Sequence, residues 1–444
     1  MSRPLILAFA IAFLPTPGFA DEPTLDPMDQ WAQWRGPLGT GVAPRGNPPV
    51  AWSEDSNVRW KIEIPGKGLS TPIVWGDRIF ITTTVPFGEA VTRGEPGADG
   101  GHDNVPSLRR RRFIVLAINR EDGKILWQTT VRSARPHEGT HLTGSWASNS
   151  AVTDGEHLFA YFGSGGLYSL DMAGKVLWEI DLGDMHVRHG HGEGSSPALH
   201  GDTLVVNWDH QGESFLVALD KRTGKQRWKV ARDEITSWST PLIVEHEGKA
   251  QVVVSATKRV RSYDLADGKL IWECGGLSRN VVASPVAGDG FVYVANSYDW
   301  QAMLAIRLAA ARGDITDTDA VTWTLNRHTP YVPSPILYGE SLCFLKHNQG
   351  ALTCVNAKTG KPLFGPQRLA GIRNVFASPV GAADRIYIVD RDGSAVVVKR
   401  GAEFELLARN RLDDSFSASP AVVGNELFLR GERTLYCIAE EPAD

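Results

Sequence analysis

The chain has 444 residues, of which 42% are hydrophobic and 22% charged, and its formal net charge at pH 7 is −5. A nucleic-acid-binding surface requires clustered positive charge, so this balance argues against a nucleic-acid partner. The length would suit about three average domains, but the repeats described below predict a single closed domain.

The N-terminus has the pattern of an export signal. A basic start precedes an apolar run over residues 4–14, and small residues lead up to Ala20. Such a run is typical of a cleavable signal peptide and is too short to span a bilayer. We predict a signal peptide over residues 1–20, a proline-rich lead-in over residues 21–56, no transmembrane segment, and a mature protein in the periplasm or outside the cell.

A Ser/Thr-Pro step recurs along the rest of the chain. It stands at Thr71-Pro72, Ser196-Pro197, Thr240-Pro241, Ser284-Pro285, Ser334-Pro335, Ser378-Pro379 and Ser419-Pro420, with a degenerate copy at Asn149-Ser150. The prolines at positions 197, 241 and 285 are 44 residues apart. Such a period is typical of one supersecondary unit that buries its apolar face only against its neighbours.

The repeat that starts at Ser195 predicts four short antiparallel strands. After the proline step, β-branched and apolar residues predict strands over residues 203–207 and 215–219, and a last strand carries Trp228. Asp and Gly in the connecting segments provide the tight reversals between them. Four strands per repeat are the content of one propeller blade.

An aromatic residue falls four positions after a glycine in five of the repeats. These pairs are Gly123 and Trp127, Gly174 and Trp178, Gly224 and Trp228, Gly268 and Trp272, and Gly360 and Phe364. We expect each ring to lie on an outer strand, to pack on the adjoining blade and to bury on the order of 150–250 Å². These rings are therefore expected to contribute strongly to stability.

The two ends of the repeat region complement each other. The last repeat ends near Ile438 without an outer strand, whereas residues 57–64 have the pattern of an outer strand without a blade before it. We predict that this N-terminal strand completes the last blade, which gives an all-β, eight-bladed propeller over residues 57–440 with no open edge. An insertion over residues 87–108 interrupts blade one, and the basic run 109–112 at its end is expected to be a solvated loop.

The chain has four cysteines, at positions 274, 343, 354 and 437. A hairpin that turns near Asn348 would place Cys343 opposite Cys354. Export makes a disulfide chemically possible, and two reduced buried thiols remain the alternative because the pairing register is uncertain from sequence.

His189, His191 and Glu193 alternate in the loop before the Ser196-Pro197 step. An extended chain would point all three the same way, and two imidazoles with a carboxylate suit iron, zinc or copper. This pattern predicts a metal site. The alternative is a polar channel rim, because glycines separate the three residues and no motif fixes their geometry.

The loops that precede the Ser/Thr-Pro steps are expected around one mouth of the central channel, where propellers commonly bind ligands. The candidate ligand- or partner-binding residues in these loops are His137, His141, Trp146, Arg188, Trp238, Arg279, Asn280, Tyr331, Arg373 and Asn374. Arginine and tryptophan are frequent at protein-binding surfaces. Packing of Trp146 and Trp238 between blades or inside the channel is the alternative. No serine-nucleophile motif occurs, so no catalytic residue is predicted.

The stretch from Ala218 to Trp228 resembles the tryptophan-docking repeat of quinoprotein dehydrogenases, A-x-D-x-x-T-G-K-x-x-W. Close variants occupy residues 119–127, 264–272 and 356–364. On these motifs the chain is similar to the pyrroloquinoline-quinone-like propeller family, which also contains BamB-type outer-membrane assembly proteins without a cofactor. The resemblance implies a β-propeller over nearly all of the mature chain and is less specific for activity.

The chain also departs from the family patterns. Two adjacent cysteines, a C-x-x-C-H haem motif and a lipid-bearing cysteine after the apolar run do not occur. The resemblance therefore implies the BamB-like branch, for which we expect no cofactor: a monomeric binding or scaffolding module of the cell envelope with protein or peptide partners. The alternative is a divergent quinoprotein-type oxidoreductase that uses pyrroloquinoline quinone with calcium, or a metal-dependent enzyme that uses the channel-mouth histidines.

Overall fold

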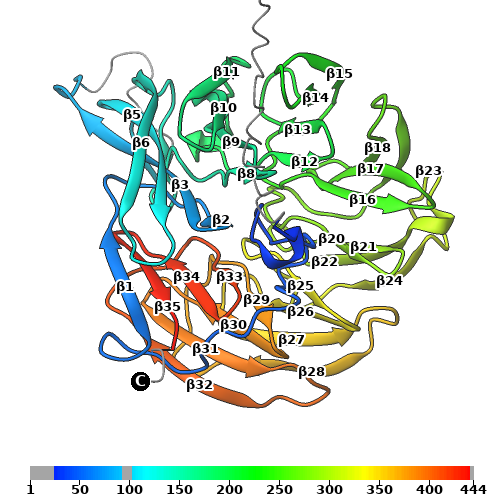
Figure 1. Ribbon diagram of the computed structural model, residues 1–444. Helices are drawn as coiled ribbons and strands as arrows, with labels where there is room; N and C mark the ends of the chain where they lie inside the picture. The colour runs from blue at the N-terminus through cyan, green and yellow to red at the C-terminus, as the bar shows by residue number, and fades with distance from the viewer. Residues whose placement is uncertain (1–24, 93–102, 441–444) are drawn as a thin grey trace, which may run out of the picture.

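The computed structural model describes residues 25–92 and 103–440, which form a ring of eight β-sheets (Figure 1). This confirms the predicted all-β, eight-bladed propeller. The expected signal peptide, residues 1–20, and part of the insertion, residues 93–102, lie outside the described residues. Within the described part of the chain, no helix is long and apolar enough to cross a membrane.

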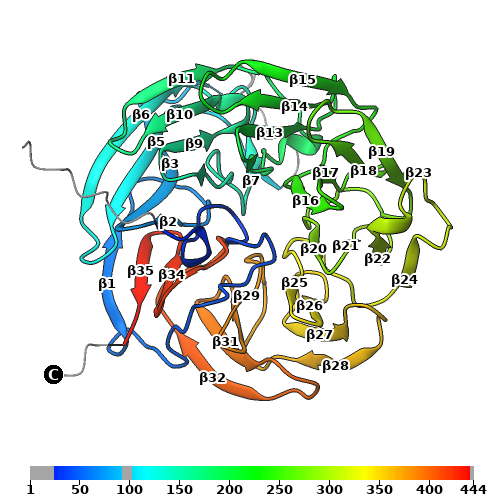
Figure 2. The same cartoon turned by 45° about the vertical axis from the view of Figure 1, so that its right-hand side comes forward.

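Each blade has four strands that lie side by side, in order from the channel to the rim (Figure 2). The first four blades are β2 (Ile73–Trp75), β3 (Arg78–Phe87), β5 (Arg110–Asn119) and β6 (Ile125–Ala134); β8 (Val152–Thr153), β9 (His157–Tyr161), β10 (Leu167–Asp171) and β11 (Val176–Ile180); β12 (Ala198–His200), β13 (Thr203–Trp208), β14 (Phe215–Asp220) and β15 (Gln226–Ala231); and β16 (Leu242–His246), β17 (Lys249–Val254), β18 (Val260–Asp264) and β19 (Leu270–Cys274). The next three are β20 (Val286–Gly288), β21 (Phe291–Asn296), β22 (Ala302–Arg307) and β24 (Val321–Leu325); β25 (Ile336–Tyr338), β26 (Ser341–Leu345), β27 (Ala351–Asn356) and β28 (Pro362–Arg368); and β29 (Val380–Ala382), β30 (Arg385–Val389), β31 (Ser394–Lys399) and β32 (Leu406–Arg411).

The eighth blade closes the ring with strands from both ends of the chain. It consists of β33 (Ala421–Val423), β34 (Glu426–Arg430), β35 (Thr434–Ile438) and, as its outer strand, β1 (Val58–Glu63). β1 pairs antiparallel with β35, with Ile62 opposite Leu435. The predicted closure is confirmed, and it removes the open edges that a linear stack of sheets would leave.

Indole rings join neighbouring blades at the rim, as the glycine–aromatic spacing predicts. The Trp127 indole donates to the Met172 carbonyl of the next blade at 3.0 Å. Gly174, in the same blade as Met172, packs against the Trp127 ring, and a Cβ at this position would lie 2.6 Å from the ring. The same joint links Trp60 to Gly123, Trp178 to Gly224, Trp228 to Gly268 and Trp323 to Gly360.

The joint between blades four and five has a different form. Trp272 is fully buried, but its indole donates to Gln251 of its own blade at 3.0 Å. The connection from β22 to β24 carries β23 (Gly313–Asp314), which pairs in parallel with β19. A longer connection therefore replaces the tight glycine turn at this position of the ring.

The insertion in blade one is shifted by one residue from its predicted bounds, because β3 extends to Phe87 and β5 begins at Arg110. The expectation that the basic run 109–112 is a solvated loop is wrong for Arg110 onward. The Arg111 guanidinium lies over the Trp146 ring, 3.9 Å from its centroid, and burial lowers its pKa to about 10. Within the insertion, β4 (Asn104–Val105) pairs with β7 (Thr140–His141).

A disulfide joins Cys343 to Cys354. The two residues lie directly opposite each other on β26 and β27, in the register that the hairpin pattern suggested. Of the two alternatives left by the sequence, the structure therefore has the disulfide. Cys274 and Cys437 are buried thiols, and burial raises the pKa of each.

Candidate functional site

The Ser/Thr-Pro steps form a hydrogen-bonded ring around the central channel. At seven of the eight junctions, the backbone N–H of one step donates at 2.9 Å to the hydroxyl of the step in the next blade. The donor–acceptor pairs are Thr71–Ser150, Ser150–Ser196, Ser196–Thr240, Thr240–Ser284, Ser284–Ser334, Ser334–Ser378 and Ser378–Ser419. A hydroxyl before each proline thus satisfies a backbone donor that would otherwise be buried without a partner.

The lead-in closes one end of this channel. Figure 2 shows the dark blue segment crossing the middle of the ring. The buried Arg35 guanidinium donates to the carbonyls of Pro335 and Pro379 at 2.8 Å each, and to that of Thr40 at 3.2 Å. Trp31 is fully buried and pairs with Val74 of blade one. Residues 31–37 therefore anchor the lead-in to several blades.

The channel contains a cavity of about 440 Å³, and Trp34 of the lead-in forms part of its wall. Its other aromatic lining residues are Trp238, Tyr298, Tyr331 and Phe376. Six hydroxyl residues of the Ser/Thr ring also line it. None of the described lining residues is lysine or arginine, so this cavity combines aromatic walls with uncharged donors and imidazoles.

Four of the ten predicted mouth residues lie in this cavity wall: His141, Trp238, Asn280 and Tyr331. The Trp238 indole donates to the Gly192 carbonyl at 2.7 Å. This bond holds the loop of residues 186–194 against the next blade. Tyr331 packs between Tyr298 and a histidine ring of the next blade, with centroid distances of 5.6 and 4.8 Å.

His189 and His191 also line the cavity, together with His141 of the preceding loop. The His191 ring is 4.7 Å from that of His141 and 5.4 Å from that of His189, centroid to centroid. Asp103 from the insertion lines the same wall. The structure thus brings three imidazoles together, two of which the alternating pattern singled out.

The expectation of an extended chain over His189, His191 and Glu193 is wrong, although all three residues line the cavity. Residues 188–190 form the short helix η3 (Arg188–Gly190), in which His189 has a φ of 58°, and Gly192 has a φ of 83°. The Glu193 carboxylate instead accepts the Ser164 N–H at 2.6 Å and the Ser164 hydroxyl at 2.5 Å. Burial raises the pKa of Glu193 to about 7. Metal binding at His189, His191 and Glu193 stays a prediction.

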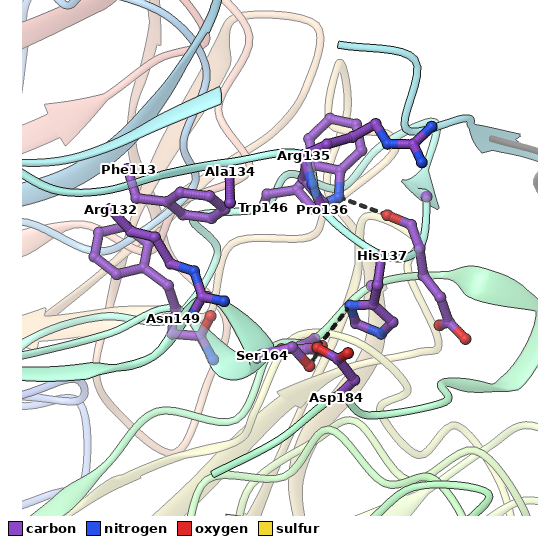
Figure 3. A pocket seen from close by; sticks show the side chains of 16 residues that line it. Phe113, Arg132, Ala134, Arg135, Pro136, His137, Trp146, Asn149, Ser164 and Asp184 are labelled. Atoms are coloured by element: carbon purple, nitrogen blue, oxygen red, sulfur yellow. Dashed lines mark hydrogen bonds and ion pairs between the residues drawn. The ribbon is translucent and has the colours of Figure 1, made fainter. Parts of the chain in front are cut away.

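Glu193 lines both the channel cavity and a smaller side cavity of about 160 Å³, and Figure 3 shows the side cavity from close by. The predicted residues His137 and Trp146 line this side cavity rather than the channel. The Trp146 indole donates to the Glu138 carbonyl at 2.9 Å. The Trp146 ring also contacts the Arg111 guanidinium, and a role of Trp146 in partner binding stays a prediction.

The other four predicted mouth residues line neither cavity. Arg188 donates through Nε to His189 at 3.2 Å. Arg279 forms a bidentate ion pair with Asp299, in which Nε donates to Oδ2 and Nη2 to Oδ1 at 2.7 Å each. Arg373 and Asn374 support the following hairpin through their backbone groups, on Asp390 and Arg391.

Sequence reasoning missed Trp34, Asp103, Tyr298 and Asn348 of the cavity wall. The last three lie between the second and third strands of their blades. These connections open onto the same mouth as the loops before the Ser/Thr-Pro steps, and propeller topology alone could have indicated them. Trp34 lies outside the repeats, so no repeat signal placed it in the channel.

Comparisons with known proteins agree with this architecture. The profile of a protein family described as outer membrane protein assembly factor BamB matches residues 42–186, 111–364 and 212–441. The outer membrane protein assembly factor BamB of Yersinia pestis is 24% identical over 328 residues, 70% of this chain and 72% of that protein. The tetrathionate hydrolase of Acidithiobacillus ferrooxidans is also 24% identical, over 54% of this chain and 52% of its own length.

Solved structures share the fold at lower identity. BamB from Moraxella catarrhalis has a TM-score of 0.57 at 15% identity and covers 87% of this chain and 98% of its own. A europium-containing methanol dehydrogenase has a TM-score of 0.60 at 10% identity and covers 90% of this chain and 89% of its own. At these identities the likeness describes the fold alone.

Proposed function

The chain belongs to the β-propeller family of the outer membrane protein assembly factor BamB, and from this premise we propose that it is a binding or scaffolding module of the cell envelope. In this proposal a protein or peptide partner binds at the channel mouth. Relatives named as outer membrane protein assembly factors support a role in protein assembly rather than in chemistry.

The shape and composition of the channel carry the proposal. The cavity has a floor formed by the lead-in, and aromatic side chains gather at its mouth. Tyr298 and Trp300 in one connection of blade five are 43% and 54% exposed. Exposed aromatic side chains beside a pocket are typical of surfaces that anchor a partner residue.

Peptide binding also agrees with the polar groups of the wall. The hydroxyl ring and the imidazoles offer hydrogen bonds to an extended backbone or a polar side chain, while the rings accept an apolar one. We therefore propose that an extended segment of the partner crosses the mouth and places one side chain in the cavity.

An oxidoreductase is the second candidate function, because quinoprotein dehydrogenases share the fold. The described cavity wall fits the quinone poorly. Pyrroloquinoline quinone is a polycarboxylate, and the described lining residues include Asp103 and Glu193 but no lysine or arginine to balance its charge. The expectation that the protein uses no quinone or calcium therefore stays our proposal.

The imidazoles of the channel wall favour a metal-dependent activity. His141, His189 and His191 approach one another there, and imidazole suits zinc, copper and iron. Stoichiometric transition metal in protein prepared without an affinity tag, lost in His189→Ala, would support this second candidate.

We also propose that the protein acts outside the cytoplasm as a monomer. The family relationship supports the cell envelope, and the apolar N-terminal run supports export by a cleaved signal peptide. N-terminal sequencing of the mature protein tests cleavage after Ala20.

Site-specific photocrosslinking in the native envelope tests the partner-binding proposal. A photoreactive residue at Tyr298 or Trp300 should crosslink to one defined polypeptide. The same residue at Leu38 of the lead-in or Leu177 of an outer strand, which are 46% and 45% exposed, is the matched control. Equal crosslinking from all four positions, or a defined adduct from Leu38 alone, would contradict the proposal.

A further inference from the structure

Two neighbouring loops at the mouth bring a second set of metal-ligating side chains together, outside the channel. His137 and Glu138 come from the connection between β6 and β8, and His186 comes from the connection between β11 and β12. One ligand atom from each of the three side chains lies within 4.8 Å of the other two. This distance is close enough for one ion to bind all three after small side-chain rotations.

The His137 ring is oriented as a metal ligand would be. Its Nε2 lies 2.6 Å from the Met185 carbonyl oxygen, which can only accept, so Nε2 carries the proton. In the neutral ring, Nδ1 is then the nitrogen whose lone pair can bind a metal ion. A bond from the second ring nitrogen to a backbone carbonyl is the usual support of a metal-bound histidine, because it fixes both tautomer and ring orientation.

The carboxylate between the loops is also held in place. Glu138 Oε2 accepts the Val187 N–H at 3.0 Å, while Oε1 lies 3.0 Å from Nδ1 of His186. The Glu138 carbonyl accepts the Trp146 indole. Both ends of this residue are therefore fixed before any ion arrives.

Further negative charge surrounds the cluster. Figure 3 shows His137 and Asp184 facing each other at the edge of the side cavity, where Nδ1 and Oδ1 are 3.5 Å apart. Two cations, Arg132 and Arg135, also line this cavity, and Arg132 is paired with Asp181 at 2.9 Å. Carboxylates from Glu138 and Asp184 would offset the charge of a divalent ion.

From this arrangement we propose that His137, Glu138 and His186 form a binding site for a divalent transition-metal ion, with Zn²⁺ as the best match to two imidazoles and a carboxylate. The ion would join the loop that follows blade one to the loop that follows blade two. The proposal stands apart from partner binding and from the channel imidazoles, since none of its three ligands lines the channel cavity.

A second cluster in the described chain, Asp154, Glu156 and His157, provides the matched control. It has one imidazole, and its aspartate is already used: Asp154 pairs with Lys221 at 2.9 Å and accepts the backbone N–H groups of residues 156 and 157. These bonds are those of a structural turn.

Calorimetric titration of the tag-free full chain with ZnCl₂, after dialysis against chelator, tests the site. We expect one Zn²⁺ per chain, with affinity reduced at least about 100-fold in His186→Ala, since loss of a mere outer-shell partner already costs roughly 10- to 100-fold. The His186 side chain is 69% exposed, so the variant should fold. Glu138→Gln should weaken binding similarly, and His157→Gln should not change it.

Three results would overturn the site: no Zn²⁺ binding by the wild type at 100-fold molar excess, affinity in His186→Ala within about threefold of the wild type, or loss of the single site in His189→Ala instead. The last result would assign the metal to the channel imidazoles. Circular dichroism of each variant verifies that the propeller is folded, and so separates loss of ligand from loss of structure.

Discussion

Arg35→Ala should release the lead-in from the channel without unfolding the ring. The substitution removes the donors to the buried carbonyls of Pro335 and Pro379, whereas the Thr40 carbonyl keeps the Leu337 N–H at 3.3 Å. A buried acceptor left without a partner costs about 1–3 kcal/mol. For these two carbonyls the sum is about 2–6 kcal/mol, and water that enters the vacated space will offset part of it, so we expect about 3 kcal/mol.

This loss should be local, because Arg35 joins the lead-in to blades six and seven. About 3 kcal/mol corresponds to roughly a 100-fold change in an opening equilibrium. Hydrogen exchange of the lead-in measures it directly: the Trp31 N–H donates to Val74 at 3.0 Å and the Ala43 N–H donates to Gly381 at 2.8 Å. Both amides should exchange about 100-fold faster in the variant, while amides of the outer strands keep their rates.

Arg45→Ala is the matched control in the same segment. Arg45 is 57% exposed and pairs with Asp26 and Asp29 at the surface, and exposed pairs contribute about 0–1 kcal/mol. Exchange in the lead-in should then change less than about fivefold. Wild-type protection of Trp31 and Ala43 in Arg35→Ala would refute the role of the buried guanidinium as the anchor of the channel floor.

Three further predictions concern stability. Gly174→Ala should lower the free energy of unfolding in chemical denaturation by about 2–4 kcal/mol, because φ is +86° and the new Cβ would lie 2.6 Å from the Trp127 ring. Gly201→Ala is the control: its φ is +54° with nothing within 4 Å of the new Cβ, and it should lower the same quantity by about 1–2 kcal/mol. Equal losses in the two variants would contradict the packing of Gly174 on the Trp127 ring. Burial raises the pKa of Glu193 in the folded protein to about 7, against 4.5 for an unperturbed glutamate. Between pH 4.5 and 7 the folded state therefore binds more protons than the unfolded state, and the free energy of unfolding of the wild type should fall by up to about 3 kcal/mol as the pH rises through this range. Glu193→Gln should lack that decline in urea titrations, and parallel pH curves for the two proteins would show that the carboxylate is not held as described. Replacing Cys343 and Cys354 together with alanine should lower the free energy of unfolding by about 2–3 kcal/mol, as expected for a crosslink across 11 residues, and reductant should then have no further effect; unchanged denaturation would mean that the disulfide adds nothing.

The blades could be predicted from sequence because their signals are local and repeated. Each Ser/Thr-Pro step, each tight turn and each glycine–aromatic pair lies within one 44-residue unit, and the unmatched strand at residues 57–64 indicated how the ring closes. Stacking many copies of the same unit leaves little choice of architecture.

The site was harder to predict because its geometry depends on contacts between loops. Alternation of His189, His191 and Glu193 carries information only if the chain is extended, and the positive φ values of His189 and Gly192 turn it instead. The partner of Glu193 is Ser164, which lies in a glycine-rich connection of the neighbouring blade. The sequence carries no periodic signal for such a pair, nor for Trp34 in the channel.

The hydroxyl ring shows a case in between. The sequence shows that serine or threonine recurs before the prolines, and the blade-to-blade hydrogen bonds explain why a hydroxyl stands there. At the remaining junction, Arg430 donates to the carbonyl and the hydroxyl of Ser70, at 3.2 and 2.5 Å.

A hydrogen-exchange footprint of the purified protein with its crosslinked partner tests the central claim most directly. If the open end of the channel is the binding face, amides in residues 137–149, 186–194, 278–282 and 328–332 should slow on complex formation, and those of the lead-in over residues 31–43 should keep their rates. Slowing confined to the lead-in face, with the mouth loops unchanged, would contradict it.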